Sequence, residues 1–195
     1  MTAAMRSERG DVYVLDSAAE VARVAADTFV ALVAGVLADR LTARVALAGG
    51  STPKAMYRLL ASPAYRERVE WGRVEIFFGD ERCVPPDHPD SNYKMAREAL
   101  LDHVPLLAHH VHRIAGERRP EEAAALYQQL LAPVGDPPQL DLVMLGMGPD
   151  GHTASLFPGH PEPSTPGDAL VIAVHQSPKP PPTRISFTYR LINAA

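Results

Sequence analysis

The sequence predicts an α/β fold with a largely parallel sheet, and three observations support this prediction. Runs of strand length alternate with runs of helix length along most of the chain. Several expected strands are continuously apolar, as strands are when both faces of a parallel sheet are buried. Three of them end in glycine followed by polar residues, and ligands collect beyond the carboxyl ends of such strands. We therefore expect the three polar loops to face one crevice.

The individual elements follow from periodicity and from residues typical of helix ends. A short strand is expected at 12–15, and a long amphipathic helix lies within 16–41, where Ser17 and Glu20 have capping-box spacing. Its predicted apolar stripe comprises Val21, Val24, Ala25, Thr28 and Phe29. The other expected strands are 43–49, 73–79, 111–114, 140–146, 169–175 and 184–190. The other expected helices are 53–62, 91–104 and 121–134.

Composition excludes several classes of protein. A length of 195 residues suits a single domain, 1–195. The net charge of −4 argues against non-specific binding to nucleic acid, whose phosphates demand a basic surface. No apolar run approaches the length of a membrane span, and the N-terminus lacks the apolar core of a secretory signal. The single Cys83 cannot form an internal disulfide, so we expect a cytoplasmic protein without a membrane partner.

The glycine-rich turn Gly49-Gly50-Ser51-Thr52, followed by a proline, lies between an expected strand and an expected helix. Glycine permits close approach of a ligand, and free N–H groups at a helix start bind anions such as phosphate. Alternatively, the turn is only a tight connection in which Ser51 or Thr52 is the N-cap. The pattern is neither a P-loop nor GxGxxG, so it gives no support for ATP or NAD.

Asp80-Glu81-Arg82 follows the strand at 73–79. Asp80 could act as a base or bind sugar hydroxyls, and the guanidinium of Arg82 could neutralise an anion or oxyanion. The alternative is a local surface ion pair.

Asp150-Gly151-His152 is the sharpest pattern in the chain. Histidine is the side chain best suited to moving protons near neutral pH, and a neighbouring carboxylate can orient its ring. Gly151 would let both side chains reach one space. Alternatively, Asp150 makes an ordinary turn and His152 caps a following short helix.

Two basic residues, Lys179 and Arg184, flank a run of prolines in a C-terminal region with no acidic residues after 175. Such residues suit a phosphate ligand, although solvated loop charges are the simpler interpretation. The cluster His109, His110 and His112 matches none of the common zinc patterns, so we expect no metal.

Four stretches together resemble the signature blocks of the 6-phosphogluconolactonase family. They are "LAGGSTPKAMYRLL", "IFFGDERCVPPDHPDSNY", "LDLVMLGMGPDGHTASLFPGH" and "SPKPPPTRISFT", and they occur in the order found in that family. The resemblance implies a Rossmann-like fold with helices on both faces of the sheet, similar to glucosamine-6-phosphate deaminase and ribose-5-phosphate isomerase. It also implies hydrolysis of 6-phospho-D-glucono-1,5-lactone in the oxidative pentose phosphate pathway, without a metal or organic cofactor.

The resemblance also implies roles for individual residues. The phosphate loop of the family is matched by Gly49, Gly50, Ser51 and Thr52, and its basic residues at the phosphate end by Arg184 and Lys179. Asp80 and Arg82 match residues that line the sugar site. His152 matches the catalytic histidine, with Asp150 beside it, and Arg82 or backbone N–H groups would stabilise the oxyanion.

One position separates related activities. Sugar-phosphate deaminases of this fold continue from a similar Asp-Gly-His block to a Glu seven residues after the Asp, whereas this chain has Phe157 there. A phenyl ring cannot relay a proton, which favours hydrolysis over a deaminase or isomerase activity. A non-catalytic sugar-phosphate-binding protein is a further alternative.

The resemblance covers residue 43 almost to the end, and family members continue beyond Ala195 through another strand and helices. The chain is therefore expected to lack those elements. The expected partner is a small sugar phosphate lactone, and the expected assembly is a monomer or a weak homo-oligomer.

Overall fold

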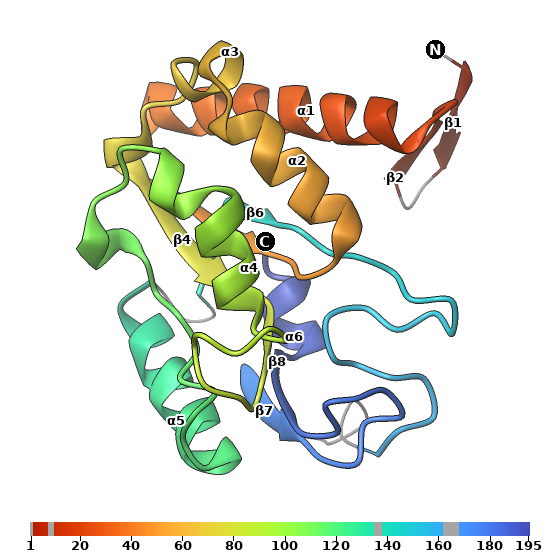
Figure 1. Ribbon diagram of the computed structural model, residues 1–195, viewed down its shortest axis with the longest axis vertical. Coiled ribbons are helices and arrows are strands. Elements are labelled where there is room, and N and C mark those ends of the chain that lie inside the picture. The colour runs from red at the N-terminus through yellow and green to blue at the C-terminus, as the bar shows by residue number, and fades with distance from the viewer. Residues whose placement is uncertain (1, 8–9, 135–137, 162–167) are drawn as a thin grey trace.

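The computed structural model describes residues 2–7, 10–134, 138–161 and 168–195 (Figure 1). The strands are β1 (Thr2–Ser7), β2 (Gly10–Val14), β3 (Ala43–Leu47), β4 (Val74–Phe78), β5 (Asp80–Arg82), β6 (Leu142–Val143), β7 (Val171–Val174) and β8 (Arg184–Phe187). The α-helices are α1 (Ala18–Asp39), α2 (Ser51–Ala61), α3 (Pro63–Arg66), α4 (Asn92–Ala99), α5 (Pro120–Leu131) and α6 (Tyr189–Ile192). Single 3₁₀ turns occur at Trp71–Arg73, Leu101–His103, Ala108–His110 and Ala132–Val134.

A parallel sheet of order β4-β3-β6 forms the centre of the fold, which confirms the predicted α/β class. β3 and β4 are almost entirely buried, as their continuous apolar runs require. Ile76 makes an isolated parallel bridge to Val111, so the strand expected at 111–114 is reduced to one contact. The strand expected at 140–146 is also short, although backbone hydrogen bonds from Asp141 to Arg44 and from Met144 to Ala46 extend its pairing.

A second, antiparallel sheet of order β5-β8-β7 corrects the expectation that residues 80–82 lie in a loop past a strand end. Asp80 pairs with Ser186, and Arg82 pairs with Arg184. Gly79, between β4 and β5, is where the chain passes from the first sheet to the second. Its N–H donates to Leu47 O of β3, and its carbonyl accepts the N–H of Phe187 of β8. The strand expected at 184–190 ends at Phe187, and the chain then enters α6.

An N-terminal hairpin joins β1 to β2, whereas only the second strand was expected. The long helix α1 follows it. Ser17 is the N-cap of α1, and its Oγ accepts the Glu20 N–H at 3.2 Å, as the capping spacing predicts.

The buried face of α1 is rotated from the predicted stripe. Its buried residues are Ala22, Ala26, Phe29, Val30, Val33 and Leu37. Thr28, which was assigned to the stripe, is exposed. Abundant alanine around the helix makes the apolar face ambiguous in sequence, and the tertiary partners decide it; the ring of Phe29, for example, stacks on Trp71 at 5.9 Å.

By length and composition, α1 could cross a membrane, which corrects the expectation that no apolar run approaches that length. Its most apolar stretch is 33% buried inside the protein. The helix packs along α2, and its Ala22, Ala26 and Phe29 belong to the hydrophobic core. The packing therefore accounts for the apolar residues on the buried face of the helix.

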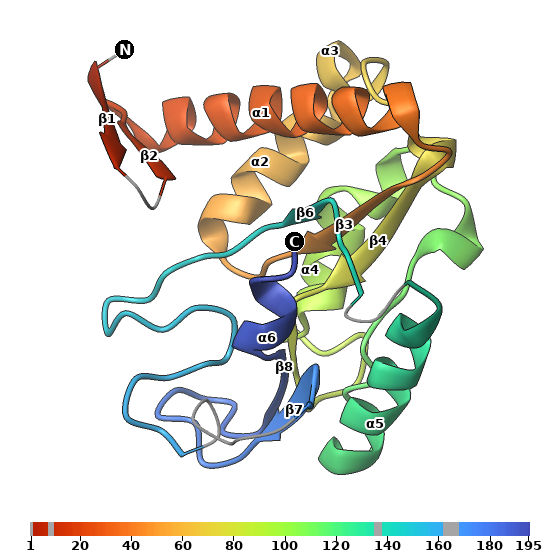
Figure 2. The ribbon, with the colours of Figure 1, turned by 180° about the vertical axis from the view of Figure 1, so that it is seen from behind.

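Helices flank the two sheets. Figure 1 shows α2 and α4 in front of the parallel strands, with α1 crossing above them. From behind, α6 lies near the ends of the strands, and α5 packs against β7 and β8 (Figure 2). Tyr127 of α5 accepts the Phe78 N–H at 2.9 Å and donates to His112 O at 2.9 Å.

The end of β3 is held by a second buried phenol. The Tyr57 hydroxyl of α2 accepts the Ala48 N–H at 3.0 Å and donates to the Ala48 carbonyl at 2.8 Å. The ring is fully buried, and burial raises the pKa of Tyr57, so the hydroxyl stays protonated. Both polar groups of the first residue after β3 are thereby satisfied.

We expect Tyr57→Phe to lower the free energy of unfolding by about 1–3 kcal/mol, because it leaves both backbone groups of Ala48 buried without a partner. Urea unfolding followed by circular dichroism measures the change. Tyr189→Phe is the matched control, because Tyr189 is 43% exposed. Equal effects of the two substitutions would contradict the anchoring role of Tyr57.

Candidate active site

A cavity of about 200 Å³ opens where β3, β4 and β6 end. The predicted site residues that line it are Gly49, Gly50, Asp80, Arg82, His152 and Arg184. They come from the loop after β3, from β5, from the loop after β6 and from β8. Parallel pairing therefore brings together the three polar loops that the sequence singled out.

His152 and Asp150 form a direct hydrogen bond. Nδ1 of His152 lies 2.6 Å from Oδ1 of Asp150. Hydrogen bonding, first from His152 and then from Lys179, holds the pKa of Asp150 well below its usual range. Because the carboxylate is ionised at neutral pH, Nδ1 carries the proton of a neutral ring and donates it, which leaves a lone pair on Nε2.

The neighbouring backbone and the ring of Phe157 hold this pair in place. Gly151 has φ of +82°, the conformation that glycine allows, and turns the chain between the two side chains. Residues 153–156 form a bridged turn, so His152 caps no following helix. The buried ring of Phe157 lies against the imidazole with centroids 4.6 Å apart. His152 therefore has a polar partner on one side and an apolar wall on another.

Gly148 provides the space in which the imidazole lies. A Cβ atom at this position would overlap Cε1 and Nδ1 of His152 and crowd Oδ1 of Asp150. The backbone closes the same turn, because Gly148 N donates to His152 O and Gly151 N donates to Gly148 O, both at 2.9 Å.

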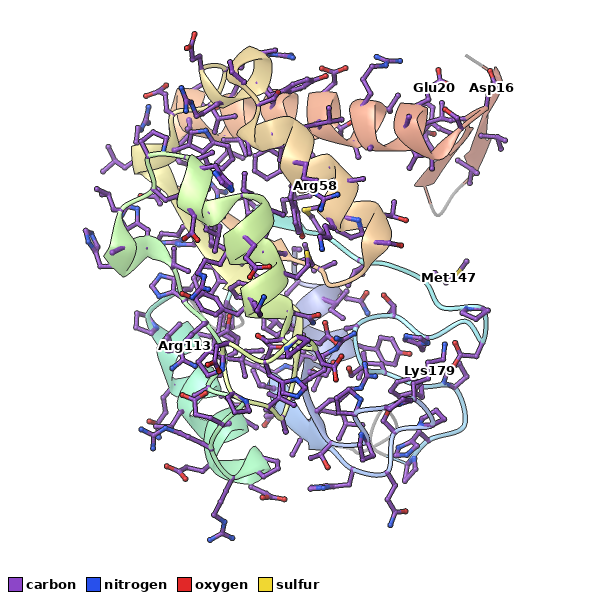
Figure 3. All side chains as sticks on the ribbon, in the orientation of Figure 1. Asp16, Glu20, Arg58, Arg113, Met147 and Lys179 are labelled. Carbon is purple, nitrogen blue, oxygen red and sulfur yellow. The ribbon has the colours of Figure 1, made fainter. Side chains whose placement is uncertain are left out.

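Lys179 lies beside Asp150. Its Nζ donates to the same Oδ1 atom, at 3.0 Å, that accepts the imidazole N–H. Figure 3 shows Lys179 and Met147 on two long loops on the same side of the molecule. The cavity lining, taken over the residues that the structure describes, includes Arg82 and Arg184 but not Lys179.

The glycine-rich turn leads directly into α2. Gly50, with φ of +111°, is the N-cap and supplies no side-chain cap, so Ser51 and Thr52 are the first two helical residues. This corrects the alternative in which one of those hydroxyls is the N-cap. The first N–H groups of the helix remain available to an anion, and the helix dipole favours negative charge there.

Asp80 lines the cavity but is tied to the protein. Its Oδ2 accepts Ser155 Oγ–H at 2.7 Å, and its Oδ1 accepts Asn92 Nδ2–H at 2.9 Å. Its exposed fraction is 6%. The carboxylate thus links β5 to the loop that carries His152 and to the start of α4.

Arg82 lines the cavity from the end of β5. Its Nη1 donates to the Asp90 carbonyl at 2.7 Å, which fixes the guanidinium against the loop before α4. Its buried Nε has no hydrogen-bond partner among the residues that the structure describes. Because the residue lines the cavity, its guanidinium is the part suited to an anionic oxygen of a ligand there.

Arg184 is buried, and burial lowers its pKa. Its guanidinium donates to the carbonyls of Lys179, Pro180 and Pro181 at 3.1–3.2 Å, and its Nη1 lies 3.4 Å from Ser155 Oγ. Most of its donors therefore hold the proline-rich loop rather than point into the cavity.

Three supporting residues were not identified from sequence: Glu81, Asn92 and Ser155. The buried Glu81 carboxylate accepts the N–H groups of Asn92 and Tyr93 at the start of α4, and burial raises its pKa. Asn92 and Ser155 both lie in the quoted sequence blocks, but small polar residues in loops carry no distinctive pattern. Across the described ranges, no three His, Cys, Asp or Glu side chains are grouped so that they could share a metal ion.

Residues 16–195 match the family model described as "Glucosamine-6-phosphate isomerases/6-phosphogluconolactonase". The chain belongs to this family. It is 45% identical over 170 residues to a probable chloroplastic 6-phosphogluconolactonase 3 of Oryza sativa subsp. indica, covering 82% of this chain and 51% of that protein. It is 40% identical to the 6-phosphogluconolactonase of Streptomyces coelicolor, covering 89% of this chain and 70% of that protein.

Comparison with solved structures supports the same family. The 6-phosphogluconolactonase of Trypanosoma brucei superposes with a TM-score of 0.81 at 32% identity, covering 94% of this chain and 78% of that structure. The Rossmann-like α/β class predicted from the sequence is therefore confirmed. The chain spans about half the length of the rice relative.

We expect Gly148→Ala to displace the imidazole from Asp150, because the new Cβ atom would occupy the position of the ring. The ¹H–¹⁵N signals of the His152 ring measure the change. Gly146→Ala is the control, since a Cβ atom there meets nothing within 4 Å. A Gly148→Ala protein with unchanged ring signals would contradict the packing described above.

Proposed function

We propose that this protein hydrolyses 6-phospho-D-glucono-1,5-lactone to 6-phosphogluconate, a step of the oxidative pentose phosphate pathway. The observation that carries the proposal is the 2.6 Å hydrogen bond between His152 and Asp150, beside a cavity that also reaches the start of α2. A base and an anion site at one cavity suit a substrate with a reactive carbonyl and a phosphate. The names of the rice and Streptomyces relatives support the same activity.

In the proposed reaction, Nε2 of His152 takes a proton from water as the water oxygen attacks C1 of the lactone. The carbonyl oxygen becomes an oxyanion, which the guanidinium of Arg82 or backbone N–H groups of the glycine-rich loop stabilise. The imidazolium, stabilised by Asp150, then gives its proton to the ring oxygen as the C1–O bond breaks. The products are the carboxylic acid and the open-chain hydroxyl, and His152 is neutral again.

The phosphate is proposed to bind at the N-terminus of α2. Gly49 and Gly50 line the cavity there, and a side chain at Gly49 would overlap the Asn92 amide. Ser51 and Thr52 would add their hydroxyls to the backbone N–H groups. Binding at the far end of the substrate would fix C1 near His152 and reduce the entropic cost of attack.

Phe157 supports hydrolysis over deamination or isomerisation. Its ring packs on His152 at the position where the deaminases are expected to carry an acid. A phenyl ring neither donates nor accepts a proton, so nothing there could drive ring opening. The intact Asp150–His152 pair also argues against a purely sugar-phosphate-binding role.

We further propose that residues 1–195 act as a single lactonase-like domain, as a monomer or weak homo-oligomer in the cytoplasm. One continuous hydrophobic core spans α1 to α6. The thiol of Cys83, the single cysteine, is partly buried, and burial raises its pKa to about 11, which suits a thiol kept reduced.

We expect His152→Ala to lower kcat by about 10²–10⁴-fold, because it removes the general base. The lactone is generated in situ, and its loss is followed above the spontaneous rate. Binding of 6-phosphogluconate should be retained, as titration calorimetry would show. His109→Ala, an exposed histidine outside the cavity, is the control. Wild-type turnover by the His152→Ala protein would remove this residue from the mechanism.

We expect Thr52→Glu to weaken 6-phosphogluconate binding by about tenfold or more, since tenfold corresponds to about 1.4 kcal/mol of repulsion. Gluconate binding should change little. The same carboxylate favours the first turn of α2, so the helix is not destabilised. Thr28→Glu on α1, also exposed, is the matched control. Equal weakening of both ligands by Thr52→Glu would count against a phosphate at this helix.

A further inference from the structure

The loop that carries Lys179 is fixed from two sides. On one side, Arg184 donates to the carbonyls of Lys179, Pro180 and Pro181. On the other, Ser177 Oγ donates to the Lys179 carbonyl at 2.9 Å, and Ser177 N donates to Pro182 O at 2.8 Å. The backbone of Lys179 therefore has one defined position, although its side chain is 36% exposed.

From this position, the ammonium of Lys179 contacts the carboxylate that orients His152. Both groups donate to a single atom, Oδ1 of Asp150, at 3.0 and 2.6 Å. A carboxylate oxygen held by an ammonium and an imidazole N–H has little freedom to rotate. The same ammonium also opposes a positive charge on the ring, because like charges close together repel each other.

We propose that Lys179 is a positioning residue of the Asp150–His152 pair, which orients the carboxylate and places a positive charge beside the imidazole, and that Arg184 holds the loop that carries it. This inference rests on the lactonase activity proposed above. It gives Lys179 a role different from the phosphate ligand that the family resemblance implies.

The Lys179–Asp150 ion pair can be removed to test this role, because its exposure makes it unimportant for folding. An ion pair with both partners more than one-third exposed contributes little to the stability of the fold. Replacing Lys179 should therefore leave the fold intact. Among the residues that the structure describes, the other charged groups that line the cavity with His152 are Asp80 and Arg82 from β5 and Arg184 from β8, and they are unchanged in the variants.

The experiment compares Lys179→Met, which keeps most of the aliphatic stem, with Lys179→Arg, which restores a cationic donor. Lys94→Met is the matched control, because Lys94 also pairs with a carboxylate, that of Glu98, on α4. Each protein is assayed with 6-phosphogluconolactone and with unphosphorylated glucono-1,5-lactone, and 6-phosphogluconate binding is measured by calorimetry.

For Lys179→Met we expect kcat to fall by about tenfold for both lactones, which is about 1.4 kcal/mol of the barrier, while 6-phosphogluconate affinity changes less than about twofold. The acid limb of the pH–rate profile should move to higher pH, because the carboxylate, without its second partner, holds a proton on the ring more strongly. Lys179→Arg should recover most of both changes. Weaker 6-phosphogluconate binding with unchanged kcat would identify a phosphate ligand and overturn the proposal.

A measurement without substrate separates this proposal from the proposed activity. The ¹H–¹⁵N signals of the His152 ring are followed against pH in wild type, Lys179→Met and Lys179→Arg. The midpoint of the ring titration should rise in Lys179→Met and return in Lys179→Arg, whether or not the protein turns over lactone. An unchanged midpoint in Lys179→Met would overturn the proposal, whereas an inactive wild type with the expected shift would overturn only the activity.

Discussion

Parallel pairing of β3 with β4 and β6 is the constraint on which the rest of the site depends. It ends three strands at one edge, so that the glycine turn before α2, the start of β5 and the loop containing His152 surround one cavity. No single loop could bring these groups together, because they are separated by tens of residues in sequence. The buried apolar residues of β3 and β4 supply the stability, and the polar loops are free to carry function.

Apart from the half-buried Arg82, the charged groups described around this edge fall into two sets. The buried ones, Asp80, Glu81 and Arg184, bind protein partners and join β5, β8, α4 and the proline-rich loop. The more accessible ones, Asp150 and Lys179, form the local network around the imidazole. A buried charge is tolerated only when its hydrogen bonds are satisfied, so the first set is committed to architecture. The second set can respond to a ligand because water still reaches it.

Much of this arrangement could be predicted from the sequence. Continuous apolar runs and strand-end glycines identified β3, β4 and the cavity edge, and the Asp-Gly-His spacing identified two side chains that the structure joins by a hydrogen bond. The pairing of residues 80–82 with 184–186 could not be predicted, because three polar residues have no strand pattern and their partner is about a hundred residues away. For the same reason the contact of Lys179 with Asp150, across 29 residues, left no local signal. The buried face of α1 was predicted wrongly because alanine occurs on several sides of the helix. Tertiary packing, and not the sequence pattern, therefore determines which side is buried.

The space above Gly148 couples residues 148 and 152 by steric contact and not by a side-chain hydrogen bond. While residue 152 carries an imidazole in this rotamer, there is no room at residue 148 for even a methyl group. A substitution at one of these positions therefore depends on the residue at the other. A side chain at 148 would fit only with a smaller side chain, and hence a different chemistry, at 152.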